Sequence, residues 1–138
     1  MSGLQQTALE DLAQRFAKAA EARDTDALIP LYHPDAKFWN NVLRHVSDTS
    51  RIIEITRLEA QVITRYDFDN LRCTLTDEGF VLQMTVAGET RSGKTFAVET
   101  CLVAQASDGL ITRIDEYVDA AQAGPIFEEL LAPPGPAS

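Results

Sequence analysis

The second half of the chain constrains the fold most, because it reads as four strand-like runs joined by short turns. The runs span residues 66–76, 80–90, 95–106 and 110–119, and they are rich in β-branched and aromatic residues. Turn-forming residues occupy 77–79, 91–94 and 107–109. Turns this short can join only antiparallel neighbours. The sequence therefore predicts one long antiparallel sheet that twists and curves.

The first half of the chain predicts three helices. Apolar residues recur at helical spacing from about residue 4 to 22, Asp24 can cap a short second helix, and residues 47–50 offer caps for a third. Residues 36–40 read as a short strand after a stop at 33–35, and Pro125 can begin a last short helix. This order predicts an α+β fold, a cone-shaped α+β barrel in which three N-terminal helices pack on a strongly curved antiparallel sheet around a central pocket.

Composition limits the classes of partner. The 138 residues suit a single domain, predicted at 1–131, followed by a Pro-rich and disordered tail at 132–138. A net charge of −9 excludes the usual electrostatic binding of nucleic acid. The sequence contains neither a basic helix nor an apolar run long enough to indicate contact with a membrane. Without a signal-peptide pattern we expect a cytoplasmic protein. Cys73 and Cys101 match no metal spacing, and we expect buried, reduced thiols.

One segment imitates a phosphate-binding loop. Residues 88–95 fit the pattern G-x-x-x-x-G-K-[ST], which needs a helix directly after it so that backbone amides face the phosphates. Residues 96–103 are instead β-branched and apolar, which favours a strand. We therefore predict a hairpin turn with a solvated Lys94 and no nucleotide site.

The last strand-like run places one carboxylate on an apolar face. Ile114, Glu116 and Val118 share that face by period-two alternation. A carboxylate there is costly unless it is paired or stays protonated, and such groups gather at functional sites. With no Arg or Lys predicted on this face, we expect a raised pKa for Glu116. A local salt bridge or a position at a sheet edge would account equally well for a carboxylate at residue 116. If the strand faces are reversed, Asp115 or Glu99 would be the pocket carboxylate instead.

Residues 32–36 (Tyr-His-Pro-Asp-Ala), the run at 108–119 and the order of helices resemble the nuclear transport factor 2 superfamily, and within it the SnoaL-like branch. The resemblance covers about residues 9–130. This superfamily includes polyketide cyclases, ketosteroid isomerases, limonene epoxide hydrolases, dehydratases and binding proteins, so the fold does not decide the activity. The SnoaL-like resemblance implies one acidic residue on the late strands for acid/base chemistry, for which Glu116 is the candidate.

The resemblance to ketosteroid isomerases does not extend to their catalytic residues. It places Asn40 where those enzymes have their base, Phe16 where they have a tyrosine, and the neighbourhood of Cys101 where they have a protonated acid. All three roles are lost, so this activity is not expected.

The resemblance to limonene epoxide hydrolases is partial. Asn40 and Glu116 match two residues that hold the attacking water, whereas Phe38 replaces the tyrosine. Gln83 and Thr85 stand at the positions of the Arg-x-Asp pair that protonates the epoxide oxygen. Gln83 can donate a hydrogen bond but cannot give up a proton at neutral pH.

The hydrolase comparison also sets the expected faces of the run at 80–90. It turns Val81, Gln83, Thr85 and Ala87 toward the pocket and leaves Phe80, Leu82, Met84 and Val86 on the outside. An apolar outer face of this kind would be covered in a homodimer with two-fold symmetry. We therefore expect a second copy of the chain on the convex face of the sheet.

Together these patterns predict a cofactor-free and metal-free SnoaL-like enzyme, a cyclase, isomerase or lyase, that acts on a small to mid-sized apolar carbonyl compound. Glu116 would be the acid/base, with Asn40 and Gln83 as polarising partners. A non-catalytic module that binds an apolar ligand, or water activation of the epoxide hydrolase type, are the alternatives. The expected substrate-binding residues are Phe16, Tyr32, Phe38, Trp39, Thr85, Ile114, Val118 and Phe127.

Overall fold

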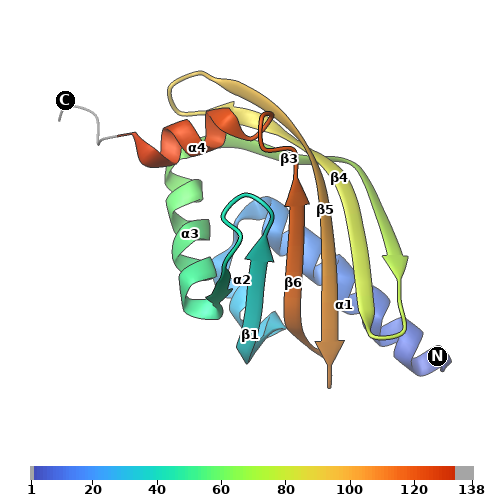
Figure 1. The fold of residues 1–138 in the computed structure, drawn as a ribbon. Helices are drawn as coiled ribbons and strands as arrows, with labels where there is room; N and C mark the ends of the chain where they lie inside the picture. The colour runs from blue at the N-terminus through green and yellow to red at the C-terminus, as the bar shows by residue number, and fades with distance from the viewer. Residues whose placement is uncertain (1, 133–138) are drawn as a thin grey trace.

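The computed structural model describes residues 2–132 and shows an α+β architecture (Figure 1). Its strands form one six-stranded sheet in the order β2-β1-β6-β5-β4-β3. The helices are α1 (Gly3–Ala22), α2 (Thr25–Leu28), the 3-10 turn η1 (Ile29–Leu31), α3 (Thr49–Val62) and α4 (Gly124–Leu131). The strands are β1 (Tyr32–Asn40), β2 (Val46–Asp48), β3 (Ile63–Leu75), β4 (Gly79–Thr90), β5 (Thr95–Ser107) and β6 (Leu110–Val118).

The predicted fold class is confirmed, with two refinements. Strands β3 to β6 form the expected antiparallel meander, but β1 pairs with β6 in parallel, so the sheet as a whole is mixed. The sheet curves around the helices and remains open, with β2 and β3 at its edges (Figure 1). Most of the predicted tail, residues 133–138, lies outside the described residues.

The ends of the helices follow local capping chemistry. Asp24 and Asp48 accept hydrogen bonds from the backbone N–H groups of Ala27 and Arg51, as the predicted caps of α2 and α3 require. The predicted stop at residues 33–35 is wrong, because β1 already begins at Tyr32. The pairing of β1 with β6 is irregular between Tyr32 and Lys37. Pro34 lies within this irregular stretch, where a proline is tolerated because no regular ladder bond is needed.

The hydrophobic core lies on the concave face of the sheet. The prediction of which half of β4 faces inward is wrong. Phe80, Leu82, Met84 and Val86 are buried beneath the helices, at 0–5% exposure. The ring of Phe16 from α1 packs against Phe80, with centroids 6.1 Å apart. Burial of the apolar half of an alternating strand is the dominant stabilising term, and it fixes the strand's orientation.

The convex face therefore carries the other half of β4, namely Val81, Gln83, Thr85 and Ala87, all half-buried. Beside them Tyr117 of β6 is 47% exposed and packs edge-on against Trp39 of β1, with ring centroids 5.5 Å apart. A homodimer through the convex face stays a prediction, and it would bury these side chains rather than the four that the sequence suggested.

The segment that imitates a phosphate loop forms a hairpin, as predicted. The backbone N–H of Thr90 donates to the carbonyl of Lys94 at 2.8 Å, and β5 begins at Thr95 without an intervening helix. The Lys94 ammonium is half-exposed and donates to Glu128 of α4 at 2.9 Å. The turn thus contacts the last helix through side chains and presents no helix N-terminus to a phosphate.

The two cysteines are unpaired. Cys101 is half-buried and pairs with Gln83 on the convex side, whereas Cys73 pairs with Leu82 and is exposed. The expectation that both are buried is therefore wrong for Cys73. It lies on the edge strand β3, where residues 69–74 are all exposed.

Candidate active site

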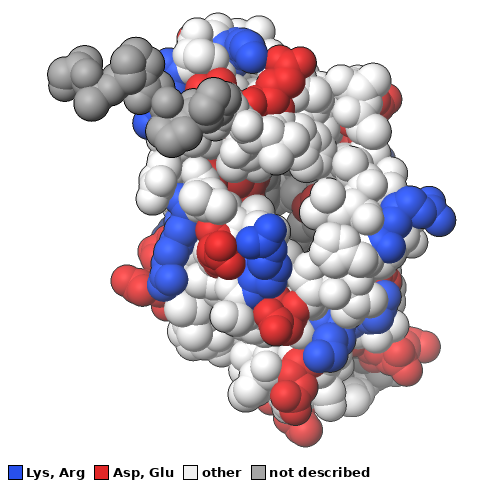
Figure 2. Space-filling view, turned by 60° about the vertical axis from the view of Figure 1, so that its left-hand side comes forward, with Lys and Arg blue, Asp and Glu red and all other residues white. Residues whose placement is uncertain are grey.

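A pocket of about 220 Å³ lies between the concave face of the sheet and helices α1, α3 and α4. Apolar and aromatic side chains form most of its wall, and the charged residues that line it are Arg23, Glu59 and Glu116. The space-filling view shows a hollow in the molecular surface with acidic side-chain atoms inside it (Figure 2). An apolar cavity of about 150 Å³ is enough to bind benzene, so this pocket suits a molecule of one or two rings.

Most of the predicted site residues meet in this pocket. They are Phe16, Tyr32, Phe38, Trp39, Asn40, Ile114, Glu116, Val118 and Phe127. Gln83 and Thr85 do not, and their expected place in the pocket is wrong. They face the convex side, where the Thr85 hydroxyl donates to the Glu99 carboxylate at 3.1 Å. Met84 and Val86 line the pocket in their place, because the apolar half of β4 turns inward.

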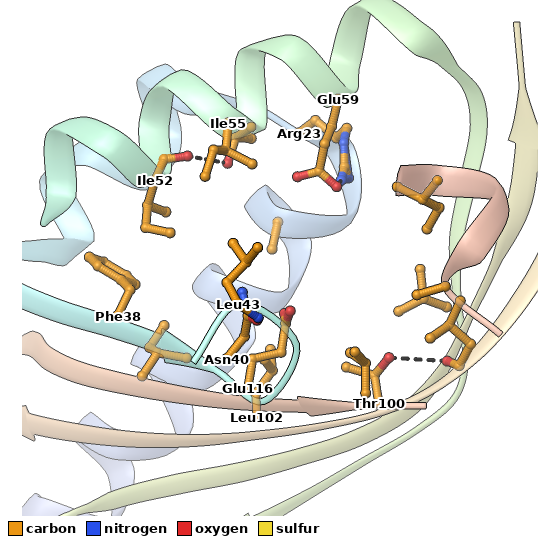
Figure 3. Close-up of a pocket in the computed structure, with 18 of the residues that line it drawn as sticks. Arg23, Phe38, Asn40, Leu43, Ile52, Ile55, Glu59, Thr100, Leu102 and Glu116 are labelled. Carbon is orange, nitrogen blue, oxygen red and sulfur yellow. Dashed lines mark hydrogen bonds and ion pairs between the residues drawn. The ribbon is translucent and has the colours of Figure 1, made fainter. Parts of the chain in front are cut away.

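Glu116 lies on the pocket floor, between the apolar residues Ile114 and Val118 of its own strand. In the sheet it pairs with Asn40 of β1 and Leu102 of β5, and its side chain points into the cavity (Figure 3). Desolvation raises the pKa of Glu116 to about 7, and the charge of Glu59 contributes in the same direction, whereas Arg23 opposes it. The direction of the shift matches the prediction. Arg23 lines the same pocket, but it comes from the end of α1 and not from the strand face of Glu116.

Asn40 is oriented by the turn that follows β1. Its side-chain oxygen accepts hydrogen bonds from the backbone N–H groups of Val42, at 3.0 Å, and Leu43, at 2.7 Å. Next to it, the Asn41 side chain both donates to and accepts from the backbone of Val118, which ties the turn to β6. With its oxygen engaged in the turn, Asn40 offers only its NH₂ group to the pocket, as a hydrogen-bond donor beside Glu116.

Tyr32 contributes a second donor. It lines the pocket at the start of β1, with its ring edge-on to Phe38 at 5.0 Å between centroids. Burial raises the pKa of the Tyr32 phenol well above its ordinary value, and the charge of Glu116 adds to this effect. The phenol therefore keeps its proton at physiological pH and can donate it in a hydrogen bond.

The sequence reading missed two charged pocket residues, Arg23 and Glu59. The guanidinium of Arg23 donates to Glu59 at 3.0 Å and lies over the ring of Tyr66, 3.4 Å from its centroid. Glu59 could have been found, because it follows Ile52 and Ile55 on one helical face. Arg23 had no such pattern, since it stands just past the end of α1.

Within residues 2–132, no cluster of three or more His, Cys, Asp or Glu side chains has the arrangement of a metal site. Over the same residues, no helix is long and apolar enough to cross a membrane.

The model of a family described as the SnoaL-like domain matches residues 13–114, which is most of the chain. No functionally curated protein has significant sequence similarity to this chain.

Solved structures share the fold at low sequence identity. A protein from Catenulispora acidiphila with a ketosteroid isomerase-like fold, in complex with trimethylamine, is 15% identical, with a TM-score of 0.70, 82% of this chain covered and 92% of that one. A proposed polyketide cyclase from Xanthomonas campestris pv. campestris is 18% identical, with a TM-score of 0.75 and coverages of 87% and 97%. An epoxide hydrolase from M. tuberculosis, similar to limonene epoxide hydrolase, is 18% identical, with a TM-score of 0.72 and coverages of 91% and 90%. At these identities the likeness establishes the fold and leaves the chemistry to the pocket.

Proposed function

The chain belongs to the SnoaL-like domain family, and on this basis we propose that it is a cofactor-free cyclase, isomerase or lyase. Its substrate would be a small apolar carbonyl compound of one or two rings, in keeping with a pocket of about 220 Å³. The proposal depends on one observation: burial in an apolar pocket raises the pKa of the Glu116 carboxyl to about 7.

The raised pKa suits Glu116 to acid/base catalysis. A group that titrates near the working pH is present in both its protonated and its ionised form, so it can donate and accept a proton in turn. Cyclisation, dehydration and isomerisation of carbonyl compounds all require such transfers. The Asn40 NH₂ group and the Tyr32 phenol would stabilise the negative charge that develops on the carbonyl oxygen.

The residues of β4 favour this proposal over epoxide hydrolysis. The resemblance to limonene epoxide hydrolases requires an acid on this strand to protonate the epoxide oxygen. Leu82, Met84 and Val86 take the inward positions of β4, and none of these side chains can give up a proton. We therefore do not propose epoxide hydrolysis.

The proposal is tested by a screen for turnover with a matched pair of variants. Cyclic ketones, β-hydroxy ketones and β-diketones of one or two rings are incubated with the wild type, with Glu116→Gln and with Glu99→Gln. The last variant changes a carboxylate on the convex face. We expect turnover by the wild type and by Glu99→Gln, and a loss of about 10²- to 10⁴-fold in Glu116→Gln, the usual contribution of general acid–base catalysis.

Full activity of Glu116→Gln on any substrate found would refute the role of this carboxylate. Ligand binding without turnover across the whole panel would favour the alternative, a non-catalytic binding module. Trimethylamine, which the C. acidiphila protein binds, is a suitable further probe for that alternative.

A further inference from the structure

A second carboxylate faces Glu116 across the pocket. Glu59 comes from α3 on the wall opposite the sheet, and the two acidic side chains point into the cavity from opposite sides (Figure 3). The charge of Glu59 contributes to the raised pKa of Glu116, so the two groups interact through the pocket. A ligand that fills the pocket lies between them.

Glu59 is the accessible half of an ion pair. Its Oε2 accepts from Nη2 of Arg23 at 3.0 Å, and the Glu59 side chain is 20% exposed whereas that of Arg23 is only 8% exposed. Among the described residues, Oε1 of Glu59 has no hydrogen-bond donor, and Figure 3 shows a carboxylate oxygen turned toward the cavity. A bound molecule can therefore reach the carboxylate more easily than the guanidinium.

Arg23 holds this carboxylate in a fixed place. Its backbone closes α1 in the left-handed region, at φ 54°, and its guanidinium rests on the ring of Tyr66. Its Nε and Nη1 atoms are buried without an acceptor among the described residues. A buried ion pair with unpaired donors is often no more stable than apolar side chains of the same size, so fold stability alone does not account for it.

We propose that Glu59 is a second catalytic residue, the base that removes a proton from the carbon next to the substrate carbonyl while Glu116 protonates the carbonyl oxygen. This inference rests on the proposed function and narrows its substrate class. The substrate would carry a carbonyl group toward the sheet and an acidic C–H bond toward α3. Two carboxylates in different surroundings, one paired with a cation and one desolvated, are suited to opposite roles.

The proton transfers balance without any further reactant. Glu59 takes the proton, the C–H electron pair becomes a new carbon–carbon double bond, and the carbonyl π pair takes the proton of Glu116. The products are an enol, a neutral Glu59 and an ionised Glu116. Return of the Glu59 proton to the same carbon, and of the enol proton to Glu116, restores both groups and gives hydrogen exchange. In a substrate with a β,γ double bond the enol is a dienol, and return of the Glu59 proton to its γ-carbon completes an isomerisation.

The test follows the exchange of α-hydrogens of cyclohexanone, a one-ring ketone, for deuterium in D₂O by ¹H NMR. We expect the wild type to accelerate exchange, and Glu59→Gln to lower this acceleration at least about 100-fold. Glu59→Asp keeps the carboxylate and should retain part of the rate. Glu54→Gln, which changes an exposed carboxylate on the same helix, should match the wild type.

The outcomes separate the two proposals. If Glu59→Gln exchanges as fast as the wild type while Glu116→Gln does not, the role of Glu59 is refuted and the proposed function stands. If the wild type gives no acceleration, the role of Glu59 is refuted, and the proposed function is decided by the screen for turnover. If neither variant lowers the exchange, both proposals fail. Should Glu59→Gln not fold, because Arg23 has lost its partner, the double variant Arg23→Gln/Glu59→Gln removes both charges. The same loss of exchange is expected there, and a wild-type rate would again refute the role of Glu59.

Discussion

Replacing Glu116 with Gln should change how the stability of the protein depends on pH. The substitution conserves shape and removes a titrating group from the pocket floor. In the folded protein the pKa of Glu116 is raised from 4.5 to about 7, chiefly by desolvation. Between these two values the unfolded chain has released the proton of Glu116 while the folded protein still holds it.

The sign and size of the effect follow from this difference. Because the folded state binds more protons than the unfolded state, the free energy of unfolding of the wild type falls as pH rises from 4.5 to 7. One pKa unit corresponds to about 1.4 kcal/mol, so the shift amounts to about 3 kcal/mol. Gln carries no charge at any of these values. Relative to the wild type, Glu116→Gln should therefore gain about 3 kcal/mol of stability between pH 4.5 and pH 8.

Urea denaturation of both proteins at half-unit steps from pH 4.5 to pH 8 measures this gain. The difference between variant and wild type should rise across the range and level off above pH 7. Glu99→Gln, on the convex face, should follow the wild type at every pH. A difference between Glu116→Gln and wild type that stays flat with pH would refute the claim that Glu116 is desolvated in the folded protein.

Three further predictions address the turn, the hairpin and the convex face. Asn40→Ala should destabilise the protein by about 1–3 kcal/mol in chemical denaturation, because the N–H groups of Val42 and Leu43 lose their acceptor, whereas Asn40→Asp keeps the acceptor and most of the stability. Addition of ATP with magnesium should leave the melting temperature unchanged, and a rise of several degrees that Lys94→Ala abolished would contradict the hairpin assignment. Light scattering at micromolar concentration should give twice the chain mass of 15.2 kDa, and a mass near 15 kDa would rule out the homodimer.

The fold could be predicted because its signals are local. The turns between strands, the caps Asp24 and Asp48, and Pro125 at the start of α4 each act through neighbouring residues. The parallel pairing of β1 with β6 was not predictable in this way. It brings together residues 76 to 79 positions apart, and no short pattern records such a contact.

The site was predicted in part, and the failures have separate causes. The face of Glu116 followed from the apolar residues around it, and the same rule would have placed Met84 and Val86 inward on β4. The resemblance to epoxide hydrolases instead indicated that Gln83 and Thr85 face inward, whereas both lie on the convex face. Residue-by-residue transfer at low identity is a weaker guide to strand orientation than the burial of apolar side chains.

The two charged residues on the pocket wall opposite the sheet, Glu59 and Arg23, differ in how far the sequence could predict them. Glu59 shares a helical face with Ile52 and Ile55, so the periodicity of α3 contained the information. Arg23 enters the pocket only because α1 ends in a left-handed residue beside the ring of Tyr66. That arrangement depends on tertiary packing, which the sequence pattern does not encode.

Titration of the side-chain carboxyl carbon of Glu116 by ¹³C NMR measures directly whether this pocket carboxylate has a raised pKa in the folded protein. Assignment of the signal comes from its disappearance in Glu116→Gln. Because desolvation raises the pKa of Glu116, we expect a titration midpoint at a pH of about 7. A midpoint near 4.5, the ordinary value of this carboxyl, would contradict the desolvation of Glu116.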